Sequence, residues 1–201
     1  MSNPSNRFVF FSFHYQRDIM RVQQIKKHSL TKGYQAAGYF DGSLSELAKT
    51  EGVTAVKRAI NKGLPGTSVT CVLIGAETYT RPWVDYEIFR SIELGKGVIG
   101  IRIHQLKDPK TGMDVAGPNP FDYLGYGGKD TRTTMVPYAK YMDGWKPYTN
   151  ADPISPSAAP YLVPGTTPIL SSLFDVYDWV DDDGFNNFPQ WVAKAARQAG
   201  R

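Results

Sequence analysis

The chain has 201 residues, of which 41% are hydrophobic and 21% charged, a composition typical of a globular protein rather than a disordered one. No apolar run approaches the ~20 residues that a membrane-spanning helix needs. The net charge of +4 is spread along the sequence, so we expect neither a membrane segment nor a nucleic-acid-binding surface. The single cysteine, Cys71, excludes an internal disulfide framework and a cysteine-based zinc site. With no signal-peptide pattern at the N-terminus, these features predict a cytoplasmic protein.

Four apolar stretches have the composition of buried strands, and they cover residues 7–13, 35–40, 68–74 and 98–104. The first is followed by polar residues 15–18, which we interpret as a loop, and then by apolar residues at helical spacing from Ile19 onward. Ser43 and Glu46 form an S-x-x-E capping box, which predicts that a helix begins there. The glycines and proline within 63–66 are expected to end that helix.

The third apolar stretch leads through residues 75–81 to Pro82, which is expected to open a helix. Proline suits the first helical position because the donor that it lacks would have no intrahelical partner there. Trp83 and Glu87 are four residues apart and therefore share one face of this helix.

The alternation of strands and helices predicts an α/β fold with a doubly wound, mainly parallel sheet. In such sheets ligands bind beyond the carboxyl ends of the strands, where loops lead into helices. Three predicted loops meet this condition: 12–18, 41–43 and 75–82. Their polar and aromatic residues indicate a ligand site at this edge.

The second half of the chain differs in character, because ten of the 14 prolines lie between residues 109 and 168. The Asp143-Gly144 pair predicts a β-hairpin over 135–148, appended to the main sheet. An irregular loop is expected over 151–168.

Two closing helices are expected over 170–180 and 189–199, the second opened by its proline. This half of the chain lacks an apolar core of its own. We therefore expect one domain over 1–201, with a core over about 7–105 and an extension over about 106–201.

Several chemistries lack their sequence signatures. Neither G-x-x-x-x-G-K-[ST] nor G-x-G-x-x-G is present, which excludes phosphate-loop NTPases and Rossmann dinucleotide-binding proteins. No metal site is predicted, because the three histidines are far apart and Asp181–Gly184 fails the alignment with a calcium-binding loop. We interpret those aspartates as an acidic surface turn. Without further context, a helical glutamate such as Glu87 is more often a solvated carboxylate than a site residue. A tryptophan such as Trp83 is more often part of the core.

The string G-x-x-T-x-x-R-x-W-V-x-Y-E-I, which runs from Gly75 to Ile88, resembles the TIR-domain family. More narrowly, it is similar to the TIR-like proteins of the bacterial antiphage system called Thoeris. Supporting blocks follow in the same order: FVFFSFHYQRD (8–18), AAGYFDGSL (36–44), TSVTCVLIG (67–75), GPNPFDYLGY (117–126) and VYDWVDDDGFNNF (176–188). The resemblance spans most of the chain, is weakest over 139–168, and implies the flavodoxin-like TIR fold.

The resemblance implies an enzyme that uses NAD⁺ as a substrate and needs no cofactor. TIR enzymes cleave the bond between nicotinamide and ribose, and the motif position of their catalytic glutamate is Glu87 here. The resemblance also implies substrate-binding roles for Ser12, Phe13, His14, Asp41, Ser43, Trp83 and Tyr86. The aromatic residues Phe121, Tyr123 and Tyr126 are candidates for a cover that excludes water from the site.

In Thoeris-like systems the TIR protein responds to phage infection by making an ADP-ribose-derived messenger, usually a cyclic ADP-ribose isomer, which activates a separate effector. The resemblance therefore implies NAD⁺, a phage-derived trigger and self-association as partners, with the effector reached through the product. Two alternatives stay open at this point. One is a non-catalytic TIR module that works by protein association, and the other is a nucleoside glycosidase of related fold.

Overall fold

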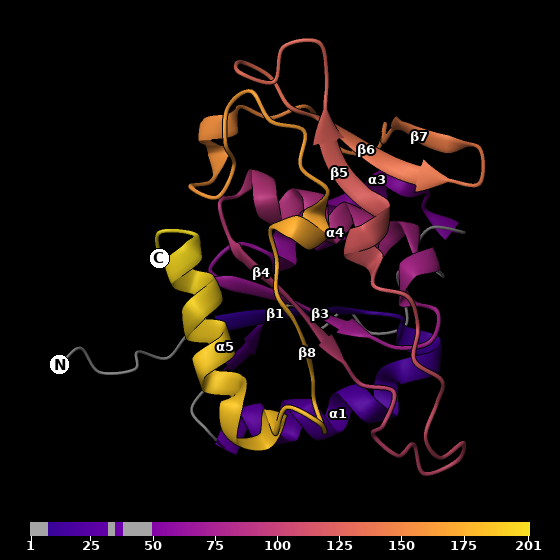
Figure 1. Ribbon diagram of the computed structural model, residues 1–201. Helices are drawn as coiled ribbons and strands as arrows, with labels where there is room; N and C mark the ends of the chain where they lie inside the picture. The colour runs from indigo at the N-terminus through magenta and orange to yellow at the C-terminus, as the bar shows by residue number, and fades with distance from the viewer. Residues whose placement is uncertain (1–7, 32–34, 38–49) are drawn as a thin grey trace, which may run out of the picture.

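The computed structural model describes residues 8–31, 35–37 and 50–201, and Figure 1 shows their arrangement. Within these ranges the main sheet has five strands in the order β2-β1-β3-β4-β8, and every neighbouring pair is parallel. The strands are β1 (Phe8–Phe13), β2 (Gln35–Ala37), β3 (Val69–Ile74), β4 (Gly97–Arg102) and β8 (Val176–Asp178). The predicted parallel α/β fold is confirmed.

Helices cover both faces of this sheet (Figure 1). Helices α1 (Tyr15–Thr31) and α5 (Gly184–Gln198) pack on one face, and α3 (Val53–Gly63) and α4 (Pro82–Glu93) pack on the other. Because side chains alternate along a strand, Phe11 of β1 enters the core under α1 and α5, whereas Phe10 enters the core under α3. The same alternation directs Ser12, at the carboxyl end of β1, toward α4.

Helix α4 lies between two sheets, which explains why it is buried on almost every side. Its outer face packs on a three-stranded antiparallel sheet of β5 (Leu124–Gly127), β6 (Val136–Tyr141) and β7 (Gly144–Pro147). Phe89 of α4 makes edge-to-face contact with Tyr126, with ring centroids 5.5 Å apart. Pro82 occupies the first turn of the helix, as its sequence predicts.

The predicted hairpin is present as β6 and β7, but it does not extend the main sheet. Instead it pairs with β5 in the second sheet, on the far side of α4. A second correction concerns residues 15–18, because α1 begins at Tyr15, directly after the strand. Gln16 and Arg17 of this first turn are exposed, whereas Asp18 is fully buried, where Arg21 contacts it.

The helix expected over 170–180 is wrong. The structure has a single 3₁₀ turn at Leu170–Ser172 and then strand β8, which pairs with β4 between Gly100 and Arg102. This segment forms the edge strand of the main sheet. Its backbone N–H and C=O groups pair with those of β4, whereas in a helix they would pair within the segment itself. The choice between the two depends on a strand distant in sequence.

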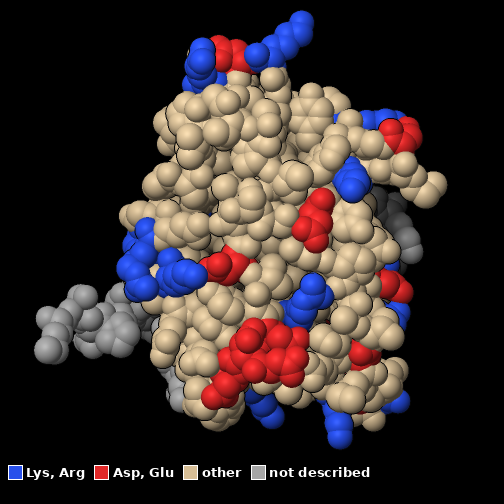
Figure 2. Space-filling model, in the orientation of Figure 1, with Lys and Arg blue, Asp and Glu red and all other residues tan. Residues whose placement is uncertain are grey.

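The last helix also begins earlier than predicted, at Gly184, so that Pro189 lies inside it. A proline at this depth removes one helical hydrogen bond, a cost of about 3 kcal/mol. Packing offsets that cost: Phe188 is fully buried, with its ring 6.2 Å from Phe11 and 5.8 Å from Trp179. The acidic turn that precedes the helix is exposed, as expected, and Figure 2 shows its carboxylates gathered on one face of the molecule.

Candidate active site

Ser12 and Glu87 meet at the carboxyl edge of the main sheet. Ser12 lies at the end of β1 and is 1% exposed, and Glu87 lies in the middle of α4 and is 5% exposed. The hydroxyl of Ser12 donates a hydrogen bond of 2.5 Å to Oε2 of Glu87. The helix thus carries a carboxylate to the place where the strand presents a hydroxyl, so the structure joins two residues that are 75 positions apart.

The environment of Glu87 makes its negative charge costly. Burial raises the pKa of this carboxyl to about 8, and the hydrogen bond from Ser12 opposes the shift only in part. No cation pairs with Glu87 among the described residues, so nothing there neutralises the carboxylate. A desolvated carboxylate without a counter-ion is prepared to interact strongly with a positively charged ligand.

Two buried hydroxyl groups hold the backbone of α4 next to Glu87. The hydroxyl of Ser91 donates to the backbone carbonyl of Glu87 at 2.6 Å, and Thr70 of β3 shares a 2.7 Å hydrogen bond with Ser91. Both side chains are fully buried. The helix is therefore fastened to the sheet one turn beyond its carboxylate.

The aromatic candidates on α4 serve mainly to pack the helix. Tyr86 is 6% exposed, belongs to the core under α3, and directs its hydroxyl at Asn61 over 3.4 Å. Trp83 is half-buried against the same core and lies edge-on to Tyr86, with centroids 6.3 Å apart. Trp83 is one turn from Glu87, so its exposed part can still border the site.

The remaining predicted residues are not all brought together. Phe13 is half-buried on the opposite side of the sheet from Ser12, against the core under α1. His14 follows at the rim and is 9% exposed. Burial, and then the positive charge of Arg81, lower the pKa of His14. Asp41 and Ser43, with the capping box, lie outside the described residues.

The cover proposed from the aromatic residues of the extension is wrong in part. Phe121 is fully buried and Tyr126 is 3% exposed, and both pack in the core beside α4. Tyr123 differs, because it is half-buried and its ring lies 5.4 Å from that of Tyr79 on the loop before α4. Phe121 and Tyr126 therefore stabilise the packing of the second sheet on α4, and of the three residues only Tyr123 lies beside the loop before α4.

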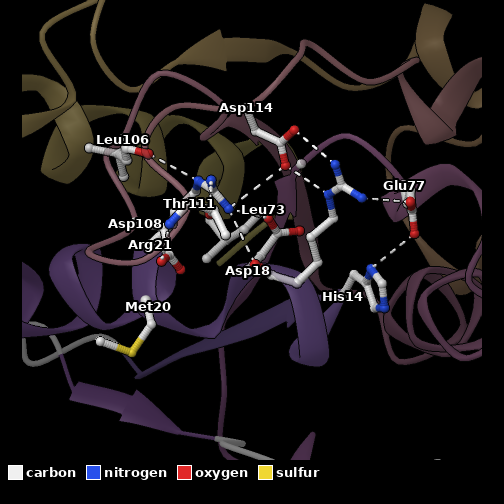
Figure 3. A network of polar contacts seen from close by, with 12 residues as sticks. His14, Asp18, Met20, Arg21, Leu73, Glu77, Leu106, Asp108, Thr111 and Asp114 are labelled. Carbon is white, nitrogen blue, oxygen red and sulfur yellow. Dashed lines mark hydrogen bonds and ion pairs between the residues drawn. The ribbon is translucent and has the colours of Figure 1, made fainter.

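A network of charged groups lies beside His14, and Figure 3 shows the part of it between His14, Glu77 and Asp114 from close by. Glu77, on the loop after β3, accepts hydrogen bonds from Arg17 at 2.7 Å and from Arg81 at 2.9 Å. Nδ1 of His14 lies 3.8 Å from the same carboxylate. Arg17 also binds Asp114 of the extension through two hydrogen bonds, of 2.7 and 2.9 Å. The network thus ties α1, the loop before α4 and the extension together.

A second arginine of α1, Arg21, is fully buried and fastens the extension further. It donates to the backbone carbonyls of Leu106 and Gly112, both at 2.9 Å, and contacts Asp18 at 3.3 Å. Burial raises the pKa of Asp18 to about 6 although Arg21 opposes the shift. Between α1 and this loop lies an open cleft of about 750 Å³, which has His14 at its rim.

Comparison with known proteins identifies the family. A family described as "Thoeris protein ThsB, TIR-like domain" matches residues 10–108. A Bacillus cereus (strain MSX-D12) protein named "Putative cyclic ADP-D-ribose synthase ThsB1" is 48% identical over 187 residues, which cover 92% of this chain and 97% of that protein. The chain belongs to the ThsB family of Thoeris TIR-like proteins. The family resemblance read from the sequence is therefore confirmed.

Several residues of the TIR-like motif determine the conformation of the loop that precedes α4. A Cβ atom at Gly75 would lie 2.2 Å from the carboxylate of Asp18, so only glycine fits there. The hydroxyl of Thr78 accepts a hydrogen bond from the backbone N–H of Gly75 at 2.9 Å and closes the loop. Arg81 binds Glu77. The motif thus specifies the loop as well as Glu87.

Sequence analysis did not single out Arg17, Glu77 or Asp114 of this TIR-like protein. Arg17 and Glu77 lie on two of the three loops predicted to border the site, and that position was the available signal. Asp114 gave no signal, because its partner Arg17 is 97 positions away.

In the described part of the chain, no helix is both long enough and apolar enough to cross a membrane.

Proposed function

We propose that this chain cleaves the bond between nicotinamide and ribose in NAD⁺ and closes the remaining ADP-ribose into a cyclic product. The observation that carries the proposal is Glu87, a buried carboxylate that is bound by a neutral hydroxyl and is without a counter-ion among the described residues. NAD⁺ is the substrate, and its nicotinamide ring brings a positive charge to this carboxylate. The printed name of the Bacillus cereus relative supports the same chemistry.

The proposed reaction separates charge in a way that suits Glu87. Nicotinamide departs as a neutral molecule, so its departure needs little help from an acid. Positive charge then develops on the ribose as an oxocarbenium-like centre, and the carboxylate stabilises it across a site of low dielectric constant. A bound cation also lowers the pKa of Glu87, so substrate binding favours the ionised form.

Ser12 acts as a positioning residue in this proposal. Its hydrogen bond to Oε2 fixes the rotamer of Glu87 and leaves Oε1 for a ribose hydroxyl. Cyclisation requires that a group of the same molecule, rather than water, captures the ribosyl cation, so the site must fold the substrate and exclude solvent. Substrate contacts by His14 and Trp83, by Phe13 and Tyr86, and by Asp41 and Ser43 stay predictions.

Membership of the ThsB family supports a biological role as part of the proposal. The cyclic product would activate a partner effector in antiphage defence, without direct contact between the two proteins. A phage-derived trigger, self-association and a cytoplasmic location belong to this proposal. So does the division of residues 1–201 into a TIR-like core and an extension within one domain.

Incubation with NAD⁺, followed by chromatography and mass spectrometry, tests the proposal. We expect free nicotinamide and a product with the mass of cyclic ADP-ribose, which is lighter than linear ADP-ribose by one water. A non-catalytic module would release no nicotinamide, even in lysate from phage-infected cells, and that result would sink the proposal. A nucleoside glycosidase would cleave nucleosides in preference to NAD⁺.

A further inference from the structure

Two arginines from different elements converge on one carboxylate at the rim of the site. Arg17 lies in the first turns of α1, Arg81 is the residue that precedes α4, and Glu77 accepts a hydrogen bond from each of them. All three side chains remain about 40% exposed, at 38%, 37% and 42%. A surface ion pair of this kind contributes only about 0–1 kcal/mol to stability, so a gain in stability does not explain why two arginines converge on Glu77.

The two guanidinium groups differ in how firmly they are held. Arg17 is fixed by its two hydrogen bonds to Asp114, which use Nε and Nη2 and leave Nη1 directed at Glu77. These contacts raise the pKa of Arg17 and lower the pKa of Asp114 to about 2. The guanidinium of Arg17 therefore has one outward donor, held in place whether or not Glu77 occupies it.

Arg81 uses only part of its donor fork. Its Nη2 binds Glu77, whereas its Nε is buried and finds no hydrogen-bond partner among the described residues. Nε and Nη2 lie on the same side of a guanidinium, where they can bind two oxygens of one phosphate. The carboxylate of Glu77 thus satisfies half of a site that a phosphate group would fill.

Strand β1 sets the distance between this rim and Glu87. Ser12 contacts Glu87, and His14, two residues further along, lies beside Glu77. Two residues of extended chain correspond to roughly 7 Å. In NAD⁺ only a few covalent bonds separate the anomeric carbon of the nicotinamide ribose from the diphosphate, so one molecule can reach both points. Arg17, Glu77 and His14 also line the open cleft of about 750 Å³ between α1 and the extension, whereas Arg81 lies outside its lining.

We propose that Arg17 and Arg81 bind the diphosphate of the dinucleotide substrate, and that Glu77 spans the two guanidinium groups until the diphosphate displaces it. This inference rests on the proposed function, because it assigns a binding role within the same site. Glu77 competes with the substrate and lowers affinity. In return it holds two like charges close together and discriminates against weakly charged anions.

The test compares four variants in equilibrium binding of ADP, which carries the diphosphate but no scissile bond. Arg81→Gln and Arg17→Gln remove the proposed contacts, Glu77→Gln removes the competing charge, and Arg197→Gln is the control. Arg197 is exposed in the last turn of α5. Calorimetry measures binding without turnover, so its outcome is separate from whether the chain cleaves NAD⁺.

We expect Arg81→Gln to weaken ADP binding about 10- to 100-fold, as the loss of a charge-assisted contact predicts. Arg17→Gln should weaken ADP binding in the same direction, whereas Glu77→Gln should tighten it about threefold to tenfold. Adenosine, which lacks phosphate, should bind all variants equally. The KM for NAD⁺ should follow the ADP affinities while kcat stays within a few-fold, and Arg81→Lys should recover part of the loss.

Equal ADP affinity in Arg81→Gln and the Arg197→Gln control would overturn the inference. So would an adenosine affinity that falls as much as that of ADP, because a misfolded site would lose both ligands. Thermal unfolding of each variant identifies any loss of fold. If the wild-type chain released no nicotinamide, the proposed function would fail on its own, and the ADP measurements would still judge the anion site.

Discussion

The two glutamates at the carboxyl edge of the sheet lie in opposite environments. Glu87 is buried, touches a neutral hydroxyl and has a pKa raised to about 8. Glu77 is 42% exposed and is bound by two arginines. Glu77 lies on the loop before α4 and Glu87 in the helix that follows it, so the difference arises from which elements cover the two residues. Glu87 faces the sheet from inside α4, whereas Glu77 lies where Arg17 of α1 and Arg81, the residue before α4, supply cations.

The comparison separates two tasks that a site for a charged dinucleotide must perform. A carboxylate kept away from cations and water retains its field for a charge that appears only during reaction. A carboxylate bound by arginines has little field left, and its role is to hold or release those arginines. Substitutions at Glu87 and at Glu77 should therefore cause different defects in catalysis, in stability and in binding.

The largest contrast is expected in turnover. Glu87→Gln removes the charge that stabilises the ribosyl cation, and we expect kcat to fall by about 10²–10³-fold or more. Glu77→Gln should leave kcat within a few-fold. Initial rates of nicotinamide release at saturating NAD⁺ measure both. Near-wild-type turnover in Glu87→Gln would show that the catalytic carboxylate lies elsewhere.

The buried carboxyl of Glu87 should also link stability to pH. The pKa of Glu87 rises from 4.5 to about 8 on folding, so the folded state disfavours its ionised form. Stability is therefore lost as pH increases from about 4.5 to 8, and the loss amounts to a few kcal/mol because each pKa unit corresponds to about 1.4 kcal/mol. Asp85 and Asp18, with pKa values raised to about 7 and 6, add losses in the same direction.

Urea unfolding at pH 5 and pH 9 tests this link. Glu87→Gln should be more stable than the wild type at pH 9 by a few kcal/mol, with a smaller difference at pH 5. Asp85 and Asp18 are present in both proteins and cancel in the comparison. A difference between wild type and Glu87→Gln that is the same at both pH values would contradict the raised pKa.

A smaller effect is expected from the partner of Glu87. Ser12→Ala removes the hydrogen bond that stabilises the carboxylate, so the pKa of Glu87 should rise further and kcat should fall about tenfold. In the wild type kcat/KM should increase with pH and level off above about 8, and in Ser12→Ala the midpoint should move to higher pH. Ser171→Ala, at an exposed serine, is the control. An unchanged midpoint would mean that Ser12 does not tune Glu87.

The smallest effect is expected from Asp114, which accepts two hydrogen bonds from Arg17. Asp114→Asn weakens the two hydrogen bonds that fix this arginine, so the KM for NAD⁺ should rise a few-fold with kcat nearly unchanged. The loss of stability should not exceed about 1 kcal/mol, because the pair is partly exposed. Asp122→Asn, at an exposed carboxylate, serves as the control. A fall in kcat without a change in KM would place Asp114 in a different role.

Local patterns predicted the part of the fold that carries Glu87. Proline at the first turn and a buried strand before it located α4 and its carboxylate, because these signals lie within a few neighbouring residues. Ser12 was expected near the site through the predicted loop over 12–18 and the family resemblance, and its contact with α4 became apparent only in the structure. The family motif then assigned the chemistry, which no local pattern contains.

Predictions failed where distant segments decide the structure. Residues 170–180 carry apolar side chains at spacings that suit a helix, yet they form a 3₁₀ turn and β8 because β4 offers an unpaired edge. Gly117 fits against the backbone of Gly75, where a Cβ atom would lie 2.1 Å from the carbonyl oxygen. No nearby sequence specifies either contact.

The sequence by itself determined a parallel α/β sheet, the helix that carries Glu87 and membership of the TIR-like family. Tertiary structure alone decided that Glu87 is buried beside Ser12, that Glu77 is bound by Arg17 and Arg81, and that the extension is fastened to α1. The physical reason is range. Strand and helix patterns reflect neighbours along the chain, whereas desolvation and ion pairing depend on which remote surfaces the fold brings together.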